Sequence, residues 1–260
     1  MKVKTADVVI LSYCKDIEYF KLNVACINSL IESEDEIEFR IVVVESNKNW
    51  LREPFRYDMN NVHVIVPEND FNFNKFLNTG IAAGESELVI LANNDLIFHR
   101  GWLSEILAIR NLRGDILSFC PFDRKSIYLK WEKFKTNAYI IGYRVPIEFV
   151  GWCVVLERSV FGVIGPLDET FDLYFQDNDF ARTLQHHGVL HALVPNSFVE
   201  HLGGRTTGIV DASKTKKYEI DKLKFETKWP PVRKSISHFR IRRLIRSIIF
   251  SVRQRLLRKS

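Results

Sequence analysis

The chain has 260 residues, 46% of them hydrophobic and 27% charged, which suits one sizeable folded domain plus an appendage and excludes a disordered protein. Its four cysteines are scattered and lie mostly in apolar runs, so we expect reduced core thiols and neither a zinc site nor a disulfide framework. The N-terminal apolar run is too short for a signal peptide, and no stretch approaches the length of a transmembrane helix. We therefore expect a cytoplasmic protein.

The net charge of +5 is unevenly distributed along the chain. Residues 232–260 hold ten of the 37 lysines and arginines and no acidic residue, which leaves 27 basic and 32 acidic residues in the rest of the chain. Any partner that is attracted by this positive charge would therefore bind to the C-terminal segment. Trp229-Pro230-Pro231 separate the two parts, so we expect a domain over 1–228 and a basic tail over 229–260.

Strands and helices alternate in the first hundred residues. We expect four buried strands, each a short continuous apolar run that ends in polar residues. They cover residues 7–13, 38–44, 62–66 and 88–92. Segments 16–33 and 76–83 carry apolar residues at helical spacing. This alternation predicts a doubly wound α/β sheet with right-handed crossovers.

The second half of the chain continues with less regular elements. Helices are predicted over 102–113, 158–163 and 179–187, and strands over 116–120, 151–156 and 192–199. Residues 121–148 show no periodicity, and both a mobile flap and a packed hairpin remain open for them.

A carboxylate follows the fourth predicted strand. Residues 88–102 read LVILANNDLIFHRGW, so a buried strand stops at Asn93-Asn94-Asp95 before a second apolar stretch. Open α/β sheets bind ligands beyond the carboxyl ends of their strands, and a carboxylate there can hold a divalent ion against a diphosphate. The alternative is a simple turn between two strands, since Asn and Asp favour turns.

Four segments, in this order, resemble the family 2 glycosyltransferases, inverting enzymes of the GT-A fold that use nucleotide-sugar donors. The segments are VVILSYCK, VVVESN, LVILANNDLIFHRGWL and GWCVVLERSVFGVIGPLDETFDLYFQDNDFARTLQHHG. The resemblance covers residues 7–205, and its last segment is the most specific. It implies a GT-A type doubly wound mixed sheet flanked by helices. It also implies metal-assisted transfer, with inversion, from a UDP-, GDP- or dTDP-sugar to a hydroxyl of a glycan or lipid-linked acceptor.

The resemblance assigns the nucleotide to the ends of the first two strands. Ser12, Tyr13 and Glu45 stand at these positions. A carboxylate at a strand end can accept a hydrogen bond from a ribose hydroxyl or a base imide. The family more often has Asp where this chain has Glu45, and a buried aromatic is the alternative for Tyr13.

Asn93-Asn94-Asp95 corresponds to the metal motif of the family, and the resemblance makes Asp95 a ligand of Mg²⁺ or Mn²⁺. Such an ion offsets the charge of the leaving diphosphate, whose oxygens and water complete its coordination. Asn93 and Asn94 then adjoin the donor, and Asn93 stands where the motif usually begins with Asp. His201 corresponds to a further metal ligand and favours Mn²⁺. Arg205 follows a Gly-Gly pair and is expected to reach the diphosphate.

The resemblance makes Asp177 the catalytic base. Inverting transfer is one in-line displacement, so a single carboxylate takes the proton of the acceptor hydroxyl. Gln176 replaces the usual Glu of the family and is expected to affect the orientation of the base or the recognition of the acceptor. Trp152 is a candidate to stack on an acceptor sugar, with core packing as its alternative. The alternative for Asp177 and Asp179 is helix capping.

The tail carries apolar residues at helical spacing between arginines from residue 236 onward, which predicts a basic amphipathic helix. Because each Lys or Arg near an anionic leaflet adds about 1 kcal/mol of attraction, we expect peripheral attachment to the cytoplasmic face of a membrane. Packing of the tail on the acidic domain or on a second subunit is the alternative. Nucleic-acid binding is not expected, because the tail has few aromatic residues for stacking on bases.

The leading hypothesis is a metal-dependent hexosyl- or deoxyhexosyltransferase of polysaccharide biosynthesis. The alternative is a non-catalytic sugar-nucleotide or glycan-binding module, which Gln176 and Asn93 favour. A nucleotidyltransferase would need a glycine-rich phosphate loop after the first strand, and Ser12-Tyr13-Cys14-Lys15 is not one. The leading hypothesis requires the base and both metal ligands to converge on one pocket.

Overall fold

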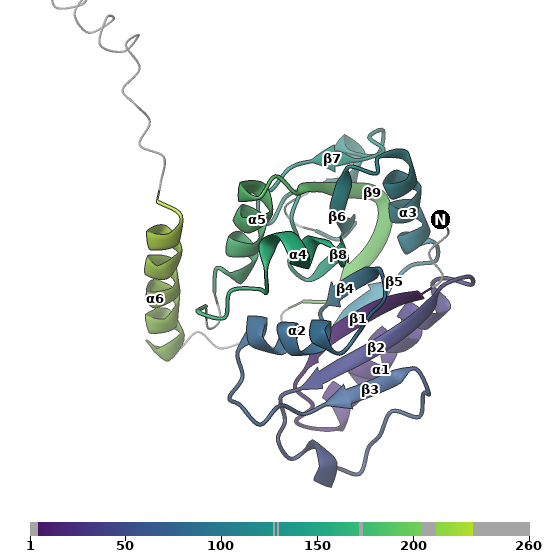
Figure 1. Ribbon diagram of the computed structural model, residues 1–260. Helices are drawn as coiled ribbons and strands as arrows, with labels where there is room; N and C mark the ends of the chain where they lie inside the picture. Colours follow the sequence, from purple (N-terminus) through teal and green to yellow (C-terminus); the bar gives the residue numbers. More distant parts are fainter. Residues whose placement is uncertain (1–4, 127, 129, 172–173, 204–211, 231–260) are drawn as a thin grey trace, which may run out of the picture. The chain divides into compact units, whose positions relative to one another are not determined.

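The computed structural model describes residues 5–126, 128, 130–171, 174–203 and 212–230 (Figure 1). The chain divides into two compact units, Met1–Phe225 and Glu226–Ser260, and only 226–230 of the second are described. The predicted tail helix therefore lies outside the described residues, and the domain boundary after residue 228 stays a prediction. Across the described ranges, every helix is too short or too polar to cross a bilayer.

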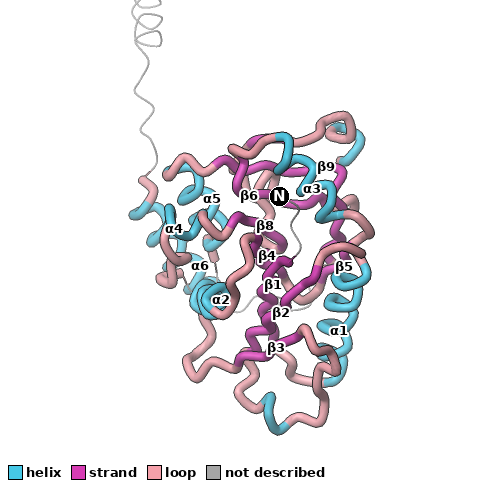
Figure 2. The backbone as a smooth tube through the Cα atoms, turned by 45° about the vertical axis from the view of Figure 1, so that its right-hand side comes forward, coloured by secondary structure: helices cyan, strands magenta, loops and turns pink. Residues whose placement is uncertain are grey.

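The first unit is built on a nine-stranded mixed sheet, counted over the described ranges (Figures 1 and 2). The strands are β1 Thr5–Ser12, β2 Glu38–Glu45, β3 Val62–Ile65, β4 Leu88–Ala92, β5 Leu96–Phe98, β6 Ile116–Phe122, β7 Ile140–Ile141, β8 Cys153–Glu157 and β9 Leu190–His201. Their order is β3-β2-β1-β4-β8-β6-β9-β5, with β7 paired to β9. Strands β1 to β4 are parallel, whereas β8 runs antiparallel to both β4 and β6.

Helices cover both faces of the sheet (Figure 2). They are α1 Ile17–Glu32, α2 Phe73–Ala82, α3 Trp102–Leu112, α4 Val160–Ile164 and α5 Gln176–His186, and a further helix, α6 Ala212–Lys228, follows β9 in the chain. One core contains apolar residues of α1 and α3, and the other contains residues of α2, α4 and α5. Alternate residues of β1 pack into the two cores, Val8 and Ile10 into one and Val9 and Leu11 into the other. The predicted doubly wound mixed sheet flanked by helices is confirmed.

Several local features differ from the sequence-based expectation, including the start of α5 at Gln176, three residues before its predicted start. Helix α2 begins at Phe73, three residues early, because the Asn72 side chain caps it by accepting from the backbone N–H of Lys75 at 2.9 Å. Residues 121–148 include the end of β6, a 3₁₀ turn at Trp131–Lys133 and the short strand β7. Helix α6 was not predicted, because its sequence is mostly charged. All four cysteines are buried and free, as expected.

The carboxyl ends of the parallel strands meet at one edge of the sheet. The register pairs Ser12 of β1 with Glu45 of β2, and Ile10 of β1 with Ala92 of β4. Because β8 is antiparallel to β4, its first residue, Cys153, pairs with Ala92. The segment before β8 therefore reaches the same edge as the residues that follow β1, β2 and β4.

A buried ion pair ties the opposite end of the sheet together. The Asp7 carboxylate, 1% exposed, accepts from the backbone N–H of Ser86 at 2.6 Å and from its hydroxyl at 2.7 Å. It also pairs with Arg158 at 2.6 Å, and Arg158 donates to the carbonyl of Ile81 at 2.9 Å. A Cβ on Gly84 would lie 2.3 Å from the Asp7 carboxylate, so only glycine allows this approach. The pair joins β1, the turn before β4 and the residue after β8.

Asp7→Ala is expected to lower the free energy of unfolding by about 3 kcal/mol, because it leaves the guanidinium of Arg158 largely buried without its carboxylate. The control is Arg40→Ala, which removes the exposed ion pair with Glu85 and is expected to cost less than about 1 kcal/mol. Urea denaturation of both variants measures the difference. Equal losses for the two variants would contradict the anchoring role of Asp7.

Candidate active site

Asp95 and His201 come together because β5 pairs with β9. The register places Leu96 opposite His201, so Asp95, immediately before β5, lies beside the end of β9. The Nε2 atom of His201 is 3.2 Å from Oδ1 of Asp95. The backbone N–H of Leu202 donates to the Asp95 carbonyl at 3.0 Å, which holds the two segments in this register.

The chemistry of this pair fits a divalent cation. Asp95 is 4% exposed, and its buried Oδ1 has no hydrogen-bond partner within the described part of the chain. The Nε2 atom of His201 lies 3.5 Å from the Asn93 amide nitrogen and 3.2 Å from Oδ1 of Asp95. An imidazole nitrogen and a carboxylate oxygen at this separation are two atoms that one cation can bind together.

Two protein ligands are enough for such a cation in the presence of a diphosphate. The described residues contain no group of three or more His, Cys, Asp or Glu side chains arranged to hold a metal. Mg²⁺ and related ions usually bind one or two carboxylates, and substrate phosphates and water complete the shell. Asp95 and His201 are therefore the residues that would hold the metal.

Trp152 supports the imidazole of His201. The two rings are stacked, with centroids 5.4 Å apart and an interplanar angle of 22°. The Trp152 carbonyl accepts from the backbone N–H of Asn93 at 2.9 Å, which links it to the metal motif. Trp152 is partly buried against both hydrophobic cores. One of its faces is thus used by His201, and its stacking on an acceptor sugar stays a prediction.

Asp177 lies in the first turn of α5 and rests against the backbone of Gly151. A Cβ on Gly151 would lie 2.0 Å from Oδ1 of Asp177, so a side chain there would displace the carboxylate. Burial raises the pKa of Asp177 to about 6, and attraction by His201 partly opposes the rise. The structure thus brings Asp177, His201 and Asp95 together around Gly151 and Trp152. Gln176, the neighbour of Asp177, is 8% exposed.

Ser12 and Glu45 occupy the strand ends as expected, but they face inward. Glu45 is fully buried and accepts from the hydroxyl of Ser12 at 2.5 Å and from the backbone N–H groups of Cys14 at 3.1 Å and Asn47 at 2.7 Å. In this structure the carboxylate braces the two strand ends instead of presenting itself to a ligand. Tyr13, which is 49% exposed, is the side chain here that a nucleotide can reach, and the buried-aromatic alternative is wrong.

Asn23 of α1, which no motif indicated, connects the two halves of the site. It is 1% exposed and donates to the hydroxyls of Ser12 at 2.6 Å and Tyr57 at 2.9 Å. Its carbonyl oxygen accepts from the amide of Asn94 at 2.5 Å. A polar residue on the buried face of an amphipathic helix was the only sequence signal. Asn94 is therefore directed to Asn23, which holds the metal motif against the end of β1.

The structure bears differently on two further predicted site residues, Asn93 and Arg205. Asn93 lies beside His201 and is partly exposed, so it adjoins the metal pair. Arg205 lies outside the described residues, and its contact with a diphosphate stays a prediction. Gly151 belongs to one of the segments that carry the family resemblance, but only the structure shows how closely it approaches Asp177.

Asp177→Asn is expected to become progressively more stable relative to the wild type as the pH rises from about 3.8 to about 6. With a pKa of about 6 in the fold against an ordinary 3.8, Asp177 holds its proton more tightly when folded, so its stabilising contribution is lost across this window. Melting temperatures measured with a metal chelator test this. Asp115→Asn is the control and is expected to gain no stability relative to the wild type as the pH rises, because Arg113 lowers the pKa of Asp115 below its ordinary 3.8. A difference independent of pH would contradict the raised pKa.

Comparisons with known proteins agree with this fold. No family model matches the chain. A segment of 68 residues is 37% identical to the N-acetylglucosaminyl-diphospho-decaprenol L-rhamnosyltransferases of Mycobacterium tuberculosis strains CDC 1551 / Oshkosh and ATCC 25618 / H37Rv. The match spans 25% of this chain and 22% of those proteins, so it covers less than a quarter of the length of the curated relatives.

Two solved structures share the architecture over most of the chain. GalNAc-T7 with UDP, GalNAc and Mn²⁺ matches with a TM-score of 0.58 and 14% identity, over 89% of this chain and 52% of that one. Residues 1–349 of S. aureus TarS match with a TM-score of 0.55 and 12% identity, over 90% of this chain and 73% of that one. The chain has the GT-A fold of these glycosyltransferases.

Proposed function

We propose that this protein is a metal-assisted, inverting glycosyltransferase that moves a sugar from a nucleotide-sugar donor to an acceptor hydroxyl. One observation carries the proposal: a carboxylate with a raised pKa, Asp177, lies beside the Asp95–His201 pair at the carboxyl edge of the sheet. The fold and the 68-residue match to rhamnosyltransferases support the same reaction class.

The reaction is a single in-line displacement. The acceptor hydroxyl oxygen bonds to the anomeric carbon, the bond from that carbon to the diphosphate breaks, and the hydroxyl proton passes to Asp177. A carboxylate with a pKa near 6 is a stronger base than an ordinary one and is still ionised at neutral pH. Asp95 and His201 would hold a divalent cation, which when bound would stabilise the charge of the departing nucleoside diphosphate.

Neighbouring residues keep these groups in place. Gly151 leaves room for the Asp177 carboxylate, and Trp152 holds the plane of the His201 ring. Asn23 joins the metal motif to the braced end of β1, next to the exposed ring of Tyr13. The acidic and imidazole groups are thus pre-positioned, which is how a transferase lowers the barrier to displacement.

The comparisons also suggest a substrate class. The mycobacterial relatives are named as rhamnosyltransferases acting on a lipid-linked diphosphate sugar, and GalNAc-T7 was solved with UDP and Mn²⁺. We therefore propose a UDP-, GDP- or dTDP-linked hexose or deoxyhexose as donor, a glycan or lipid-linked acceptor, and Mn²⁺ or Mg²⁺ as the metal. The ten basic residues of 232–260 support peripheral attachment at the cytoplasmic face of an anionic membrane.

A non-catalytic sugar-nucleotide or glycan-binding module is the second candidate, which Gln176 and Asn93 favour as departures from the usual acidic residues. A binding module has no need for a desolvated carboxylate beside its metal site, and Asp177 therefore favours catalysis. Tight donor binding without turnover on any acceptor would support the binding module.

Asp177→Asn is expected to lower sugar transfer by about 1,000-fold, because the variant cannot accept the hydroxyl proton, while donor binding is retained. Thermal shift with a panel of nucleotide sugars, with and without Mn²⁺, identifies the donor, since a bound ligand raises the melting temperature. Release of the nucleoside diphosphate then measures turnover, with Asp115→Asn as the exposed control. Unchanged turnover in Asp177→Asn would remove Asp177 from the role of base.

His201→Ala is expected to raise the Mn²⁺ concentration needed for half-maximal donor binding by at least about tenfold, because the cation loses one of two protein ligands. Thermal shift at fixed donor and varied Mn²⁺ measures it without relying on turnover. The control is His63→Ala, an exposed histidine on β3. The same Mn²⁺ requirement in both variants would exclude His201 from the metal site.

A further inference from the structure

Phe175, two residues before Asp177, has a backbone conformation that needs external support. Its φ of 65° lies in the left-handed region, the only positive φ among the non-glycine residues that the structure describes. A non-glycine residue in that region is strained and persists only where its surroundings hold it. The start of α5 also lacks a side-chain cap, so its direction depends on Phe175 and on whatever contacts it.

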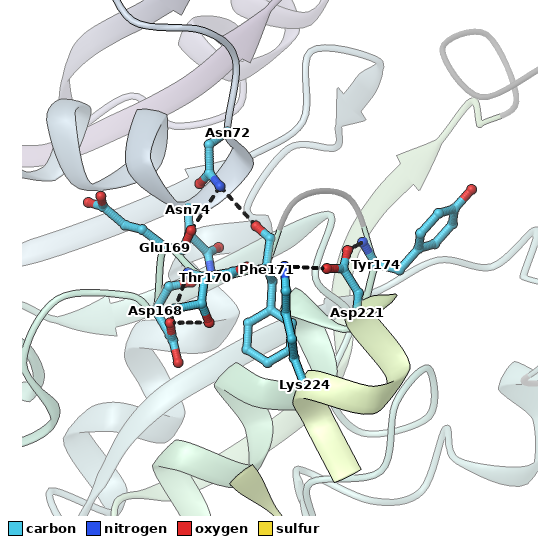
Figure 3. A network of polar contacts seen from close by, with 9 residues as sticks. All are labelled: Asn72, Asn74, Asp168, Glu169, Thr170, Phe171, Tyr174, Asp221 and Lys224. Carbon is cyan, nitrogen blue, oxygen red and sulfur yellow. Dashed lines mark hydrogen bonds and ion pairs between the residues drawn. The ribbon is translucent and has the colours of Figure 1, made fainter. Parts of the chain in front are cut away.

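Helix α6 provides polar contacts to this segment (Figure 3). The carboxylate of Asp221, which is fully buried, accepts from the backbone N–H of Tyr174 at 3.0 Å. Its other oxygen is 3.0 Å from Nζ of Lys224, and Lys224 donates to the carbonyl of Thr170 at 2.5 Å. Two residues of one helix thus hold the chain on both sides of residues 171–173.

The same face of α6 provides aromatic contacts. The ring of Phe175 stacks on Phe225, with centroids 5.4 Å apart and an angle of 29°, and lies 5.3 Å from Tyr218. Tyr174 meets Tyr218 edge-on at 5.4 Å. Positions 218, 221 and 225 are three and four residues apart, so they share one face of the helix. That face contacts the two residues that directly precede α5.

Helix α2 holds only the earlier part of the loop. The amide of Asn72 donates to the carbonyls of Glu169 at 2.9 Å and Phe171 at 3.0 Å, and Asn74 donates to that of Asp168 at 2.7 Å (Figure 3). None of these contacts reaches residues 174–175. Of the helices, α6 is the one whose contacts, as described, act directly on the residue that sets the start of α5.

We propose that α6 is a positioning element for the catalytic base and that Asp221 is its principal positioning residue. The inference rests on the proposed role of Asp177. The carboxylate of Asp177 fits against Gly151 with no room for a Cβ, so a small rotation of the first turn of α5 moves the base out of place. Misplacing a reacting group by about 1 Å can lower a rate by about 100-fold.

Loss of the contacts of α6 is expected to leave the rest of the domain folded. None of the α6 side chains that the structure describes, from residue 215 onward, belongs to the two hydrophobic cores, and those over 215–220 are exposed. A substitution at Asp221 is therefore expected to loosen residues 174–177 while the sheet stays folded. This separates a positioning role from a general contribution to stability.

The test compares Asp221→Ala with Ile220→Ala, a neighbouring substitution at a residue that is 43% exposed. For Asp221→Ala we expect kcat to fall by about 10- to 100-fold with little change in the KM for the donor. We also expect faster hydrogen exchange in the peptide that contains 174–177. Asp221→Asn, which keeps an acceptor for the Tyr174 N–H, is expected to restore most of the activity. Ile220→Ala should match the wild type.

The outcomes are distinguishable. Unchanged exchange at 174–177 in Asp221→Ala, or faster exchange with unchanged kcat, would overturn the proposal. If the wild type transfers no sugar, the proposed function fails, whereas hydrogen exchange still tests whether α6 holds Tyr174 and Phe175. Should Asp221→Ala lower the melting temperature of the whole domain, Phe225→Leu, which removes the ring stacking on Phe175 and leaves the hydrogen bond of Asp221 in place, provides the same comparison.

Discussion

The contact between the Asp177 carboxylate and the bare Cα of Gly151 is the constraint on which the site depends. It can form because β8 runs antiparallel to β4, which returns Gly151 to the edge where the parallel strands end. Burial raises the pKa of Asp177 to about 6, and His201, on which the Trp152 ring stacks, partly opposes the rise. Burial thus sets the basicity of this carboxylate, whereas sheet topology and Gly151 set its position.

Four of the buried carboxylates that the structure describes fall into two groups. Asp7, Glu45 and Asp221 each accept hydrogen bonds from neighbouring groups, and each joins segments that are distant in the chain. Asp95 has a buried oxygen without such a partner, and that oxygen lies 3.2 Å from Nε2 of His201. Because buried polar atoms are nearly always hydrogen-bonded, an unsatisfied carboxylate oxygen beside an imidazole nitrogen fits a site that could hold a cation. The hydrogen-bond partners of each carboxylate thus distinguish the residues that hold the fold together from the residues of the candidate site.

The residues that hold the candidate site in place come from elements outside the sequence motifs. Asn23 of α1 connects the braced end of β1 to the metal motif, and α6 contacts the residues that start α5. Fold similarity at 12% and 14% identity shows the architecture alone, because one fold hosts many activities. The evidence that favours transfer chemistry is therefore the convergence of Asp95, Asp177 and His201, and the fold explains how these side chains meet.

Apolar runs, helical spacing and motif order were enough to predict the parallel strands, the helices between them and the candidate residues Asp95, Asp177 and His201, because all of these are local patterns. Coordinates were needed to show that Glu45 is fully buried, that Asn23 bridges to Asn94, and that a largely charged segment forms α6 against Tyr174 and Phe175. Hydrogen bonds between residues that are dozens of positions apart depend on strand register and helix packing, which no local pattern specifies.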